Sequence, residues 1–278
     1  MSIVIGIDAG ISSTKIIGIE NGKRIMTPMS ITGNNNVASI YGILGAYLVE
    51  NQASYSDVEH VMLTGIGAQD ITTMVNDCPF TYIDEFKANG IGAKFDTGLD
   101  RFIVVSMGTG TSLVRVDGDD ISHIGGIGMG GGTLQGLSQL LLNTSNIEMV
   151  DGFATLGFPD HVNLSIMDVS KKDYGSLFSE ATASLFGKVA QSNFISRDDI
   201  AAGLVHMVLE TIGSCAVLSQ MNGGFKDFVL IGRLTELYLC KEVFPKLEQL
   251  YGVHFHIPKF APYCTALGAV LSYQQETE

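Results

Sequence analysis

Two glycine-rich turns lie close together between residues 104 and 137, and the backbone of such turns can do chemistry. Glycine lets successive backbone N–H groups approach an anion, and a helix N-terminus adds partial positive charge. The first turn lies between two apolar runs, which predicts the tip of a β-hairpin: Gly108, Thr109, Gly110 and Thr111. The second leads into a predicted helix carrying Gln135 and ends in three glycines: Gly130, Gly131 and Gly132. The pair favours bound phosphates, such as those of a nucleotide. For either turn alone, glycine can serve only to allow a positive φ.

The start of the chain has a third group of this kind. A β-branched run from Ile3 to Ile7 ends on Asp8. Small and basic residues follow: Gly10, Ser12, Ser13, Thr14 and Lys15. An aspartate can hold Mg²⁺, usually through water, while hydroxyls and a lysine can contact phosphate oxygens. The alternative is an ordinary hairpin with Asp8 in its turn and Lys15 at the surface.

Two carboxylates stand where a predicted strand passes into a predicted helix, at Asp84 and Glu85. A carboxylate at a helix N-terminus beside a cleft can accept a proton from a substrate hydroxyl. It can equally cap the helix or compensate its dipole. Asp84 suits capping and Glu85 suits the catalytic role. A further glycine, Gly232, follows a predicted strand, where it could let an adenine or ribose approach the backbone or simply form a strand-to-helix turn.

Hydrophobic periodicity and turn residues predict the elements that must hold these groups. In the first part we expect strands over 3–7, 16–19, 23–29, 60–63 and 80–83, and helices over 36–49 and 68–75. In the second we expect strands over 101–106, 113–116, 121–124, 163–169, 228–231 and 253–257, a loop over 171–178, a closely packed segment over 179–189, and helices over 199–222, 235–251 and 265–273. The helix over 199–222 is apolar nearly all round, which predicts a central helix or a subunit interface, with His206 and Met207 as packing residues.

A strand–turn–strand unit with a phosphate-type tip thus occurs twice. This repetition predicts an α/β fold of the two-lobed actin-like (ribonuclease H-like) ATPase class, with mixed sheets flanked by helices. We place the N-terminal lobe at residues 1–98 and the C-terminal lobe at residues 99–278. A chain of 278 residues suits two lobes with a cleft between them.

The composition limits which partners and which cellular compartment we expect. The net charge is -13, from 16 basic and 29 acidic residues, without a basic cluster, so we expect neither nucleic acid nor a membrane surface as partner. The 4 cysteines lack CxxC spacing, which speaks against zinc or an iron–sulfur cluster within one chain and favours reduced thiols. Asp8 interrupts the apolar start, and the longest apolar runs look too short to span a bilayer. We expect a cytoplasmic protein.

Five segments together resemble the type II pantothenate kinases, a family with the actin-like ATPase fold. The segments are IGIDAGISSTKI, DEFKANGIG, VVSMGTGTSLVRVDG, GGIGMGGGTLQGL and VLIGRLTE. The resemblance is collinear from Ile3 to about Ser272, and its most specific part is GTGTS followed by GGIGxGGGxxQGL. It implies transfer of the ATP γ-phosphoryl group to the primary hydroxyl of pantothenate, the first step of coenzyme A synthesis. It also implies a homodimer built on the helix over 199–222.

The resemblance also implies roles for single residues. Glu85 matches the general base, Asp8 would organise Mg²⁺, and Lys15 would contact the phosphates. The substrate-binding positions are Thr109, Ser112 and His123. The nucleotide-binding positions are Asp8, Gly10, Ser12, Lys15, Gly108, Thr109, Gly110, Gly130, Gly131, Gly132, Gln135 and Gly232. Phosphoryl transfer asks mainly for positioning and charge stabilisation, which these groups supply.

Two departures from the family pattern keep other functions open. His123 stands where bacterial relatives carry arginine, so a pantothenate carboxylate would be bound more weakly or the acceptor would differ, for example a pantetheine-like molecule. The first loop reads GISST, with Ile11 in place of a glycine, as in activator ATPases of 2-hydroxyacyl-CoA dehydratases and in amino-sugar kinases. An activator needs interface cysteines in a suitable loop, and an amino-sugar kinase tends to carry an aspartate base and a zinc motif; neither is evident. A non-catalytic regulator is disfavoured by Asp8, Lys15 and Glu85.

Overall fold

The computed structural model describes residues 2–33, 36–69, 71–72, 75–170 and 181–277. Its first sheet grows from an antiparallel hairpin of β1 (Ile3–Ala9) and β2 (Ser13–Glu20). Positive φ angles at Asn21 and Gly22 then turn the chain back. The other elements of this half are β3 (Arg24–Ile25), β4 (Met29–Thr32), α1 (Asn36–Glu50), β5 (Val58–Thr64) and β6 (Phe80–Tyr82). The strand order is β3-β2-β1-β5-β6, with β4 also on β2.

The second sheet repeats this topology. Its strands are β7 (Arg101–Met107), β8 (Thr111–Asp117), β9 (Asp120–Ile127), β12 (Asp227–Ile231) and β13 (His254–His256), in the order β13-β12-β7-β8-β9. β7 pairs antiparallel with β8 and parallel with β12, just as β1 pairs antiparallel with β2 and parallel with β5. The expected α/β fold with mixed sheets is therefore confirmed, and each sheet presents one hairpin turn at the same end of its central strand.

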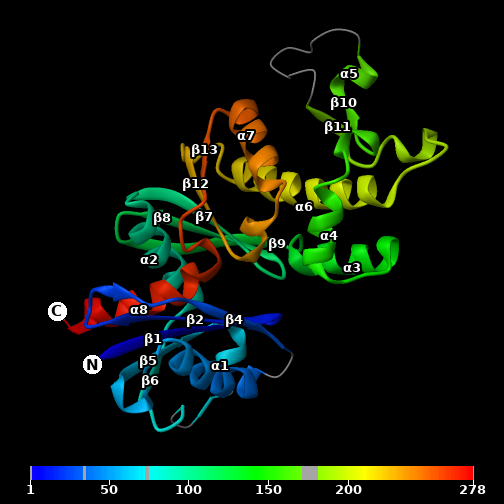
Figure 1. Ribbon diagram of the computed structural model, residues 1–278. Coiled ribbons are helices and arrows are strands. Elements are labelled where there is room, and N and C mark those ends of the chain that lie inside the picture. Colours follow the sequence, from blue (N-terminus) through cyan, green and yellow to red (C-terminus); the bar gives the residue numbers. More distant parts are fainter. Residues whose placement is uncertain (1, 34–35, 70, 73–74, 171–180, 278) are drawn as a thin grey trace.

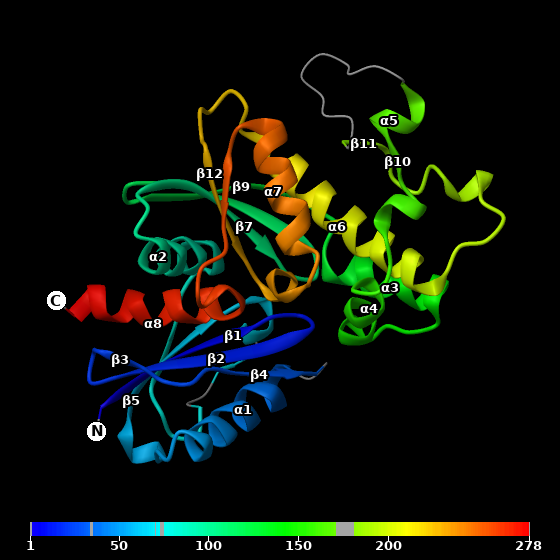
Figure 2. The ribbon, with the colours of Figure 1, turned by 45° about the horizontal axis from the view of Figure 1, so that its top comes forward.

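Two helices, α2 (Glu85–Thr97) and α8 (Cys264–Thr277), lie between the two sheets (Figures 1 and 2). They approach closely because glycines stand at the crossing: a Cβ on Gly92 would lie 2.1 Å from the Cys264 carbonyl oxygen, and one on Gly268 would lie 1.9 Å from that of Ala88. The C-terminal helix thus returns to the first sheet. The boundary after residue 98 stays a prediction.

Alternate residues of each central strand enter different cores, as the period of a strand requires. In β1, Ile3, Ile5 and Ile7 pack with α1, whereas Val4 packs with α8. In β7, Ile103, Val105 and Met107 pack under the outer helices, whereas Phe102 and Val104 pack on the inner side. Both sheets are therefore covered on both faces, which explains why their central strands read as continuous apolar runs.

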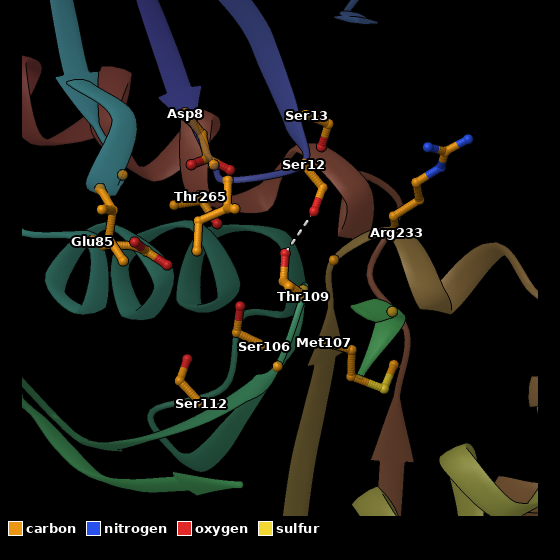
Figure 3. A pocket seen from close by; sticks show the side chains of 18 of the residues that line it. Asp8, Ser12, Ser13, Glu85, Ser106, Met107, Thr109, Ser112, Arg233 and Thr265 are labelled. Atoms are coloured by element: carbon orange, nitrogen blue, oxygen red, sulfur yellow. Dashed lines mark hydrogen bonds between the residues drawn. The ribbon is translucent and has the colours of Figure 1, made fainter. Parts of the chain in front are cut away.

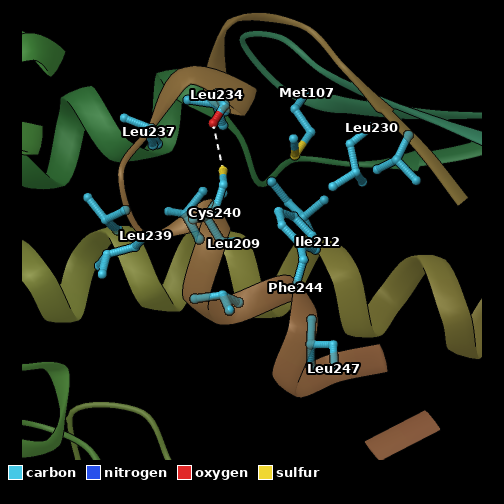
Figure 4. Packing of buried hydrophobic residues seen from close by; sticks show 14 of the residues in the cluster. Met107, Leu209, Ile212, Leu230, Leu234, Leu237, Leu239, Cys240, Phe244 and Leu247 are labelled. Carbon is cyan, nitrogen blue, oxygen red and sulfur yellow. Dashed lines mark hydrogen bonds between the residues drawn. The ribbon is translucent and has the colours of Figure 1, made fainter. Parts of the chain in front are cut away.

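The outer face of the second sheet is covered by α6 (Arg197–Ser219) and α7 (Cys240–Tyr251). Figure 4 shows Leu209 and Ile212 of α6 packing with Phe244 and Leu247 of α7 beneath Met107. Ser196 caps α6 by accepting a hydrogen bond from the Asp199 N–H at 3.0 Å. The expected long helix is confirmed, and much of its surface is used inside one chain. Beside it lie α3 (Gly131–Leu142) and α4 (Ile147–Ala154).

By length and composition alone, α6 could cross a membrane, and it is the one helix of the described residues with that property. The expectation that every apolar run is too short is therefore wrong for α6. In its most apolar window, however, 61% of the residues are buried inside the fold, and a buried core helix passes the same test.

Several expected elements differ in the structure. The helix over 68–75 is wrong for the residues that the structure describes: residues 66–68 form a single 3-10 turn, residues 71–72 are not helical, and Val75 forms a bridge with Cys78. Residues 70 and 73–74 of this segment lie outside the described residues. The strand over 163–169 is reduced to β10 (Leu164–Ser165), because Ser165 caps the short helix α5 (Ile166–Val169). The helix over 235–251 starts only at Cys240, after a 3-10 segment. Residues 171–178, expected as a loop, lie outside the described residues, as do 179–180 of the next segment, which then contains β11 (Thr182–Ser184).

Candidate active site

A cavity of about 1430 Å³ lies between the two sheets. It is lined by both hairpin turns, by the first residues of α2, α3 and α8, and by the segment that follows β12. Figure 3 shows side chains from both halves projecting into it. Most of the expected site residues line this cavity: Asp8, Gly10, Ser12, Lys15, Glu85, Gly108, Thr109, Gly110, Ser112, Gly131, Gln135 and Gly232. Three do not: Gly130, Gly132 and His123.

Asp8 and Lys15 form an ion pair in the wall of the cavity. They lie opposite one another in the β1–β2 hairpin, and the Lys15 Nζ donates to the Asp8 Oδ2 at 3.0 Å. Their side chains are only 16% and 9% exposed, in the order Lys15 and Asp8, so this pair is shielded from solvent. Asp8 therefore sits on a buried strand end as a carboxylate held in place by a cation, rather than as a solvated turn residue.

The two hairpin turns meet across the cavity. The hydroxyl oxygens of Ser12 and Thr109 are hydrogen-bonded at 2.8 Å, although the residues belong to different sheets (Figure 3). The second turn is tight, because the Gly108 N–H donates to the Gly110 carbonyl at 2.9 Å. Hydroxyls from both halves are thus brought to one place, which suits a ligand with several phosphate oxygens.

The glycines at the start of α3 serve mainly to support the second hairpin turn. The Gly131 N–H donates to the Gly108 carbonyl at 2.8 Å, and the Gly132 N–H donates to the Thr109 carbonyl at 2.9 Å. A Cβ on Gly130 would lie 2.6 Å from the Thr109 carbonyl oxygen. These N–H groups are already satisfied by protein, so the expected direct cradle for phosphates is, at Gly131 and Gly132, a buttress for the turn that lines the cavity.

Glu85 occupies the first position of α2, and its neighbour Asp84 is the N-cap. The Asp84 carboxylate accepts a hydrogen bond from the Lys87 N–H at 2.9 Å, so capping is done by Asp84. Glu85 remains free to face the cavity. Burial, and secondarily the negative charge of Asp8, raises the pKa of Glu85 to about 7, while Lys15 acts in the opposite direction. A carboxyl group with such a pKa is well matched to proton transfer near neutral pH.

His123 lies one aromatic ring away from the cavity. Its exposed imidazole stacks on the ring of Phe86, with the ring centroids 4.0 Å apart and an interplanar angle of 12°. Phe86 lines the cavity, whereas His123 does not. His123, the position predicted to contact a substrate carboxylate, therefore contacts a residue of the cavity wall but does not itself line the cavity. The other predicted substrate contacts, Thr109 and Ser112, do line the cavity.

Sequence reasoning missed several cavity residues. Thr64 ends β5 next to Asp8 and is 1% exposed, and its hydroxyl has no hydrogen-bond partner among the described residues. Arg233 lines the cavity and pairs with Glu148 at 2.9 Å. Ser106 and Thr265 line it as well. Thr64 was signalled by its place at the end of a strand before Gly65-Ile66-Gly67, but Thr265 had no signal.

Gly232 has a structural reason of its own. Its φ is +94°, and a Cβ there would lie 2.5 Å from the Met107 carbonyl oxygen. The residue therefore allows the chain after β12 to cross closely over the end of β7. It also lines the cavity, so both interpretations given to it, a tight turn and a ligand approach, are compatible with its position.

Known proteins match the chain in sequence and in fold. The Fumble family model matches residues 66–238. The type II pantothenate kinase of Staphylococcus epidermidis (strain RP62A) is 27% identical over 275 residues, which cover 96% of this chain and 98% of the relative. The type II pantothenate kinase of Bacillus cereus (strain ATCC 10987) is 30% identical over 226 residues, covering 76% and 77%.

Solved structures extend the likeness to the fold alone. An activator of the 2-hydroxyisocaproyl-CoA dehydratase from Clostridium difficile with bound ADPNP has a TM-score of 0.68 at 15% identity, covering 99% of this chain and 98% of the activator. A ROK family glucokinase from Streptomyces griseus in complex with glucose and AMPPNP has a TM-score of 0.56 at 14% identity, covering 99% and 100%. The actin-like two-sheet architecture is thereby confirmed.

The sequence matches decide the family. The family model covers more than half of the chain, and the pantothenate kinases align along most of their own length. The chain belongs to the Fumble family and to the family of the type II pantothenate kinases.

Proposed function

We propose that this protein is an ATP-dependent kinase that phosphorylates the primary hydroxyl of pantothenate, the first step of coenzyme A synthesis. The observation that carries the proposal is Glu85: a carboxyl group with a pKa of about 7, at a helix N-terminus, facing the same cavity as the Asp8–Lys15 pair and both hairpin turns. The relatives of this chain that are named type II pantothenate kinase support the choice of reaction and acceptor.

The nucleotide is proposed to lie across the two sheets. The hydroxyls of Ser12 and Thr109 and the backbone of the Gly108 turn would contact the phosphates, with Lys15 as a point charge. The base and ribose would extend towards Gly232, where Arg233 lines the other end of the cavity. In Figure 3, Arg233 lies well away from Asp8 and Glu85, which leaves room for an extended nucleotide between them.

The donor set around Asp8 fits Mg²⁺. No group of three or more His, Cys, Asp or Glu side chains that could hold a metal occurs among the described residues. Mg²⁺ typically keeps several waters and uses one or two carboxylates plus substrate phosphates. Asp8 supplies such a carboxylate, and the unpartnered hydroxyl of Thr64 beside it can accept a hydrogen bond from a bound water. When bound, the ion would neutralise charge that develops on the phosphates.

The proposed reaction needs one base. The Glu85 carboxylate accepts the proton of the primary hydroxyl as that oxygen bonds to the γ-phosphorus, and the bond from this phosphorus to the bridging oxygen breaks to release ADP. Because only the ionised carboxylate can accept the proton, turnover should fall as the pH drops below about 7. Ser112 and Thr109 are proposed to hold the acceptor beside Glu85.

A homodimer and a cytoplasmic location complete the proposal. The homodimer rests on the family resemblance, and the location rests on the 4 cysteines without CxxC spacing, which favour reduced thiols. The long helix α6 is the proposed dimerisation element, although its residues Leu204, Val208 and Ile212 are buried within one chain. Light scattering of the purified protein would measure the oligomeric state directly.

The test is an ADP-release assay with Mg²⁺ and ATP, using pantothenate, pantetheine, N-acetylglucosamine or no acceptor. We expect turnover that depends on pantothenate or on pantetheine. Glu85→Gln should lower kcat at least ~10²-fold, the usual size of a general-base effect. The matched control is Asp84→Asn, which changes the neighbouring capping carboxylate. ATP hydrolysis that is independent of every acceptor would contradict the proposal and favour an ATPase that serves a protein partner.

A further inference from the structure

Asn89 is a fully buried polar residue that the proposed reaction does not explain. It lies one helical turn after Glu85 on α2 and is 0% exposed. Its Oδ1 accepts a hydrogen bond from the Thr265 hydroxyl at 2.6 Å, whereas its Nδ2 has no partner among the described residues. A buried amide with an unpaired donor is costly to keep. Such a residue is better explained by the position that it fixes than by the stability that it adds.

Thr265 places this hydrogen bond at the cavity. It is the second residue of α8 and lines the cavity that Asp8 and Glu85 also line. Figure 3 shows the three side chains on the same side of that cavity. Because the Thr265 hydroxyl donates its proton to Asn89, its rotation is fixed and its oxygen can only accept hydrogen bonds from the cavity.

Each of the two helices that this bond joins makes a close contact with one of the sheets near the bond. A Cβ on Gly6 of β1 would lie 2.0 Å from the Ala266 carbonyl oxygen, so the start of α8 is seated on the strand that carries Asp8. A Cβ on Gly90 would lie 2.7 Å from the Ile121 side chain, so α2 is seated on β9 of the other sheet. The Asn89–Thr265 bond therefore joins α8, which contacts the strand that carries Asp8, to α2, which begins with Glu85.

We propose that Asn89 and Thr265 form a positioning pair that fixes Glu85 relative to Asp8. This inference rests on the proposed function, because it assigns Glu85 the role of base. A displacement of about 1 Å at a reacting group can cost about 10²-fold in rate, so a hydrogen bond that fixes the first turns of α2 against the start of α8 has a large effect on kcat. Neither residue needs to touch the acceptor for this role.

The experiment compares two substitutions at one position. Thr265→Val keeps the shape of the side chain but removes the hydroxyl, whereas Thr265→Ser keeps the hydroxyl. We expect Thr265→Val to lower kcat roughly 10- to 100-fold with the KM for ATP changed by less than about twofold, and Thr265→Ser to restore most of the rate. The control is Thr97→Val, which removes a hydroxyl that donates to the Ala93 carbonyl at 2.7 Å at the far end of α2. It should leave kcat unchanged.

A second measurement does not depend on activity. Amide hydrogen exchange of a peptide covering residues 85–93 should speed up in Thr265→Val and stay as in the wild type in Thr265→Ser, because the bond holds the first turns of α2. Unchanged exchange and kcat in Thr265→Val would overturn the inference. So would a loss confined to the acceptor KM, which would make Thr265 a direct contact, or an equal loss in Thr97→Val. A wild-type protein without acceptor-dependent turnover would reject the proposed function alone, and the exchange data would still decide the positioning role.

Discussion

Glu85 shows how a functional residue can lower stability. The folded protein raises its pKa from 4.5 to about 7, so the folded state keeps the proton to a higher pH than the unfolded chain. The stability contributed by this group is complete below pH 4.5 and is lost as the pH rises through about 7. At neutral pH the protein therefore keeps a carboxylate that its surroundings disfavour, as expected of a group selected for proton transfer.

Glu85→Gln should accordingly stabilise the protein at alkaline pH. Glutamine resembles the protonated acid, so the variant and the wild type should unfold with similar free energies near pH 4. At pH 8 the variant should be more stable, by at most about 3 kcal/mol, since one pKa unit corresponds to about 1.4 kcal/mol. Urea unfolding at the two pH values measures this difference. If the variant and the wild type had equal free energies of unfolding at both pH values, burial would not raise the pKa of Glu85.

His123 gives a second prediction at a single residue. Because its ring stacks on Phe86 at the cavity wall, an arginine there can stack on the same ring and extend its charged group past it. His123→Arg should lower the KM for pantothenate about 3- to 10-fold and leave that for pantetheine unchanged, since only pantothenate carries a carboxylate. Steady-state kinetics with both acceptors makes the comparison. An equal change for both would place the carboxylate elsewhere.

At the scale of elements, the hairpin turns could be predicted well from the sequence because their determinants are local. Gly108 to Thr111 and Asn21-Gly22 carry their own turn signals, and both turns occur as expected. The helix over 68–75 was wrong because its apolar residues, including Ala68, Ile71 and Val75, serve the core under α1 from irregular backbone. Periodicity alone cannot distinguish these two uses of the same residues.

The candidate site also contains residues that the sequence reveals and residues that it does not. Asp8, Lys15 and Glu85 could be found because each is a charged residue close to an apolar run. Asn89 and Thr265 could not, because their importance arises from the contact of two helices that lie 176 positions apart in the chain. The place of His123 could not be predicted for a related reason: strand alternation does not reveal that Phe86 stands between it and the cavity.

The close packing of α3 against the second hairpin turn leads to a prediction at this scale. Gly130→Ala would place a Cβ within 2.9 Å of three backbone atoms of residues 108–110. We expect a loss of about 1–3 kcal/mol in stability and a raised KM for ATP, because the turn itself must move. Gly136→Ala is the matched control on the same helix, since its Cβ would meet nothing within 4 Å. Equal effects of the two on KM would show that helix propensity, rather than the turn, is responsible.

At the scale of the whole molecule, the two sheets have separate cores but share α2, α8 and the contact between Ser12 and Thr109. A nucleotide bound to both turns adds a connection between the halves. It should raise the free energy of unfolding by about 2.7 kcal/mol at a concentration of 100 times Kd. Calorimetry with Mg²⁺ and ADP should show a single transition at a higher temperature.

The same experiment can locate the nucleotide. If the phosphates lie between the sheets, ADP with Mg²⁺ should slow amide exchange at residues 8–15 and at residues 108–112 together. Ser12→Ala and Thr109→Ala should each weaken the effect of ADP on both segments, because each hydroxyl contributes to one shared phosphate site. Protection confined to residues 108–112 would mean that the nucleotide binds one sheet only.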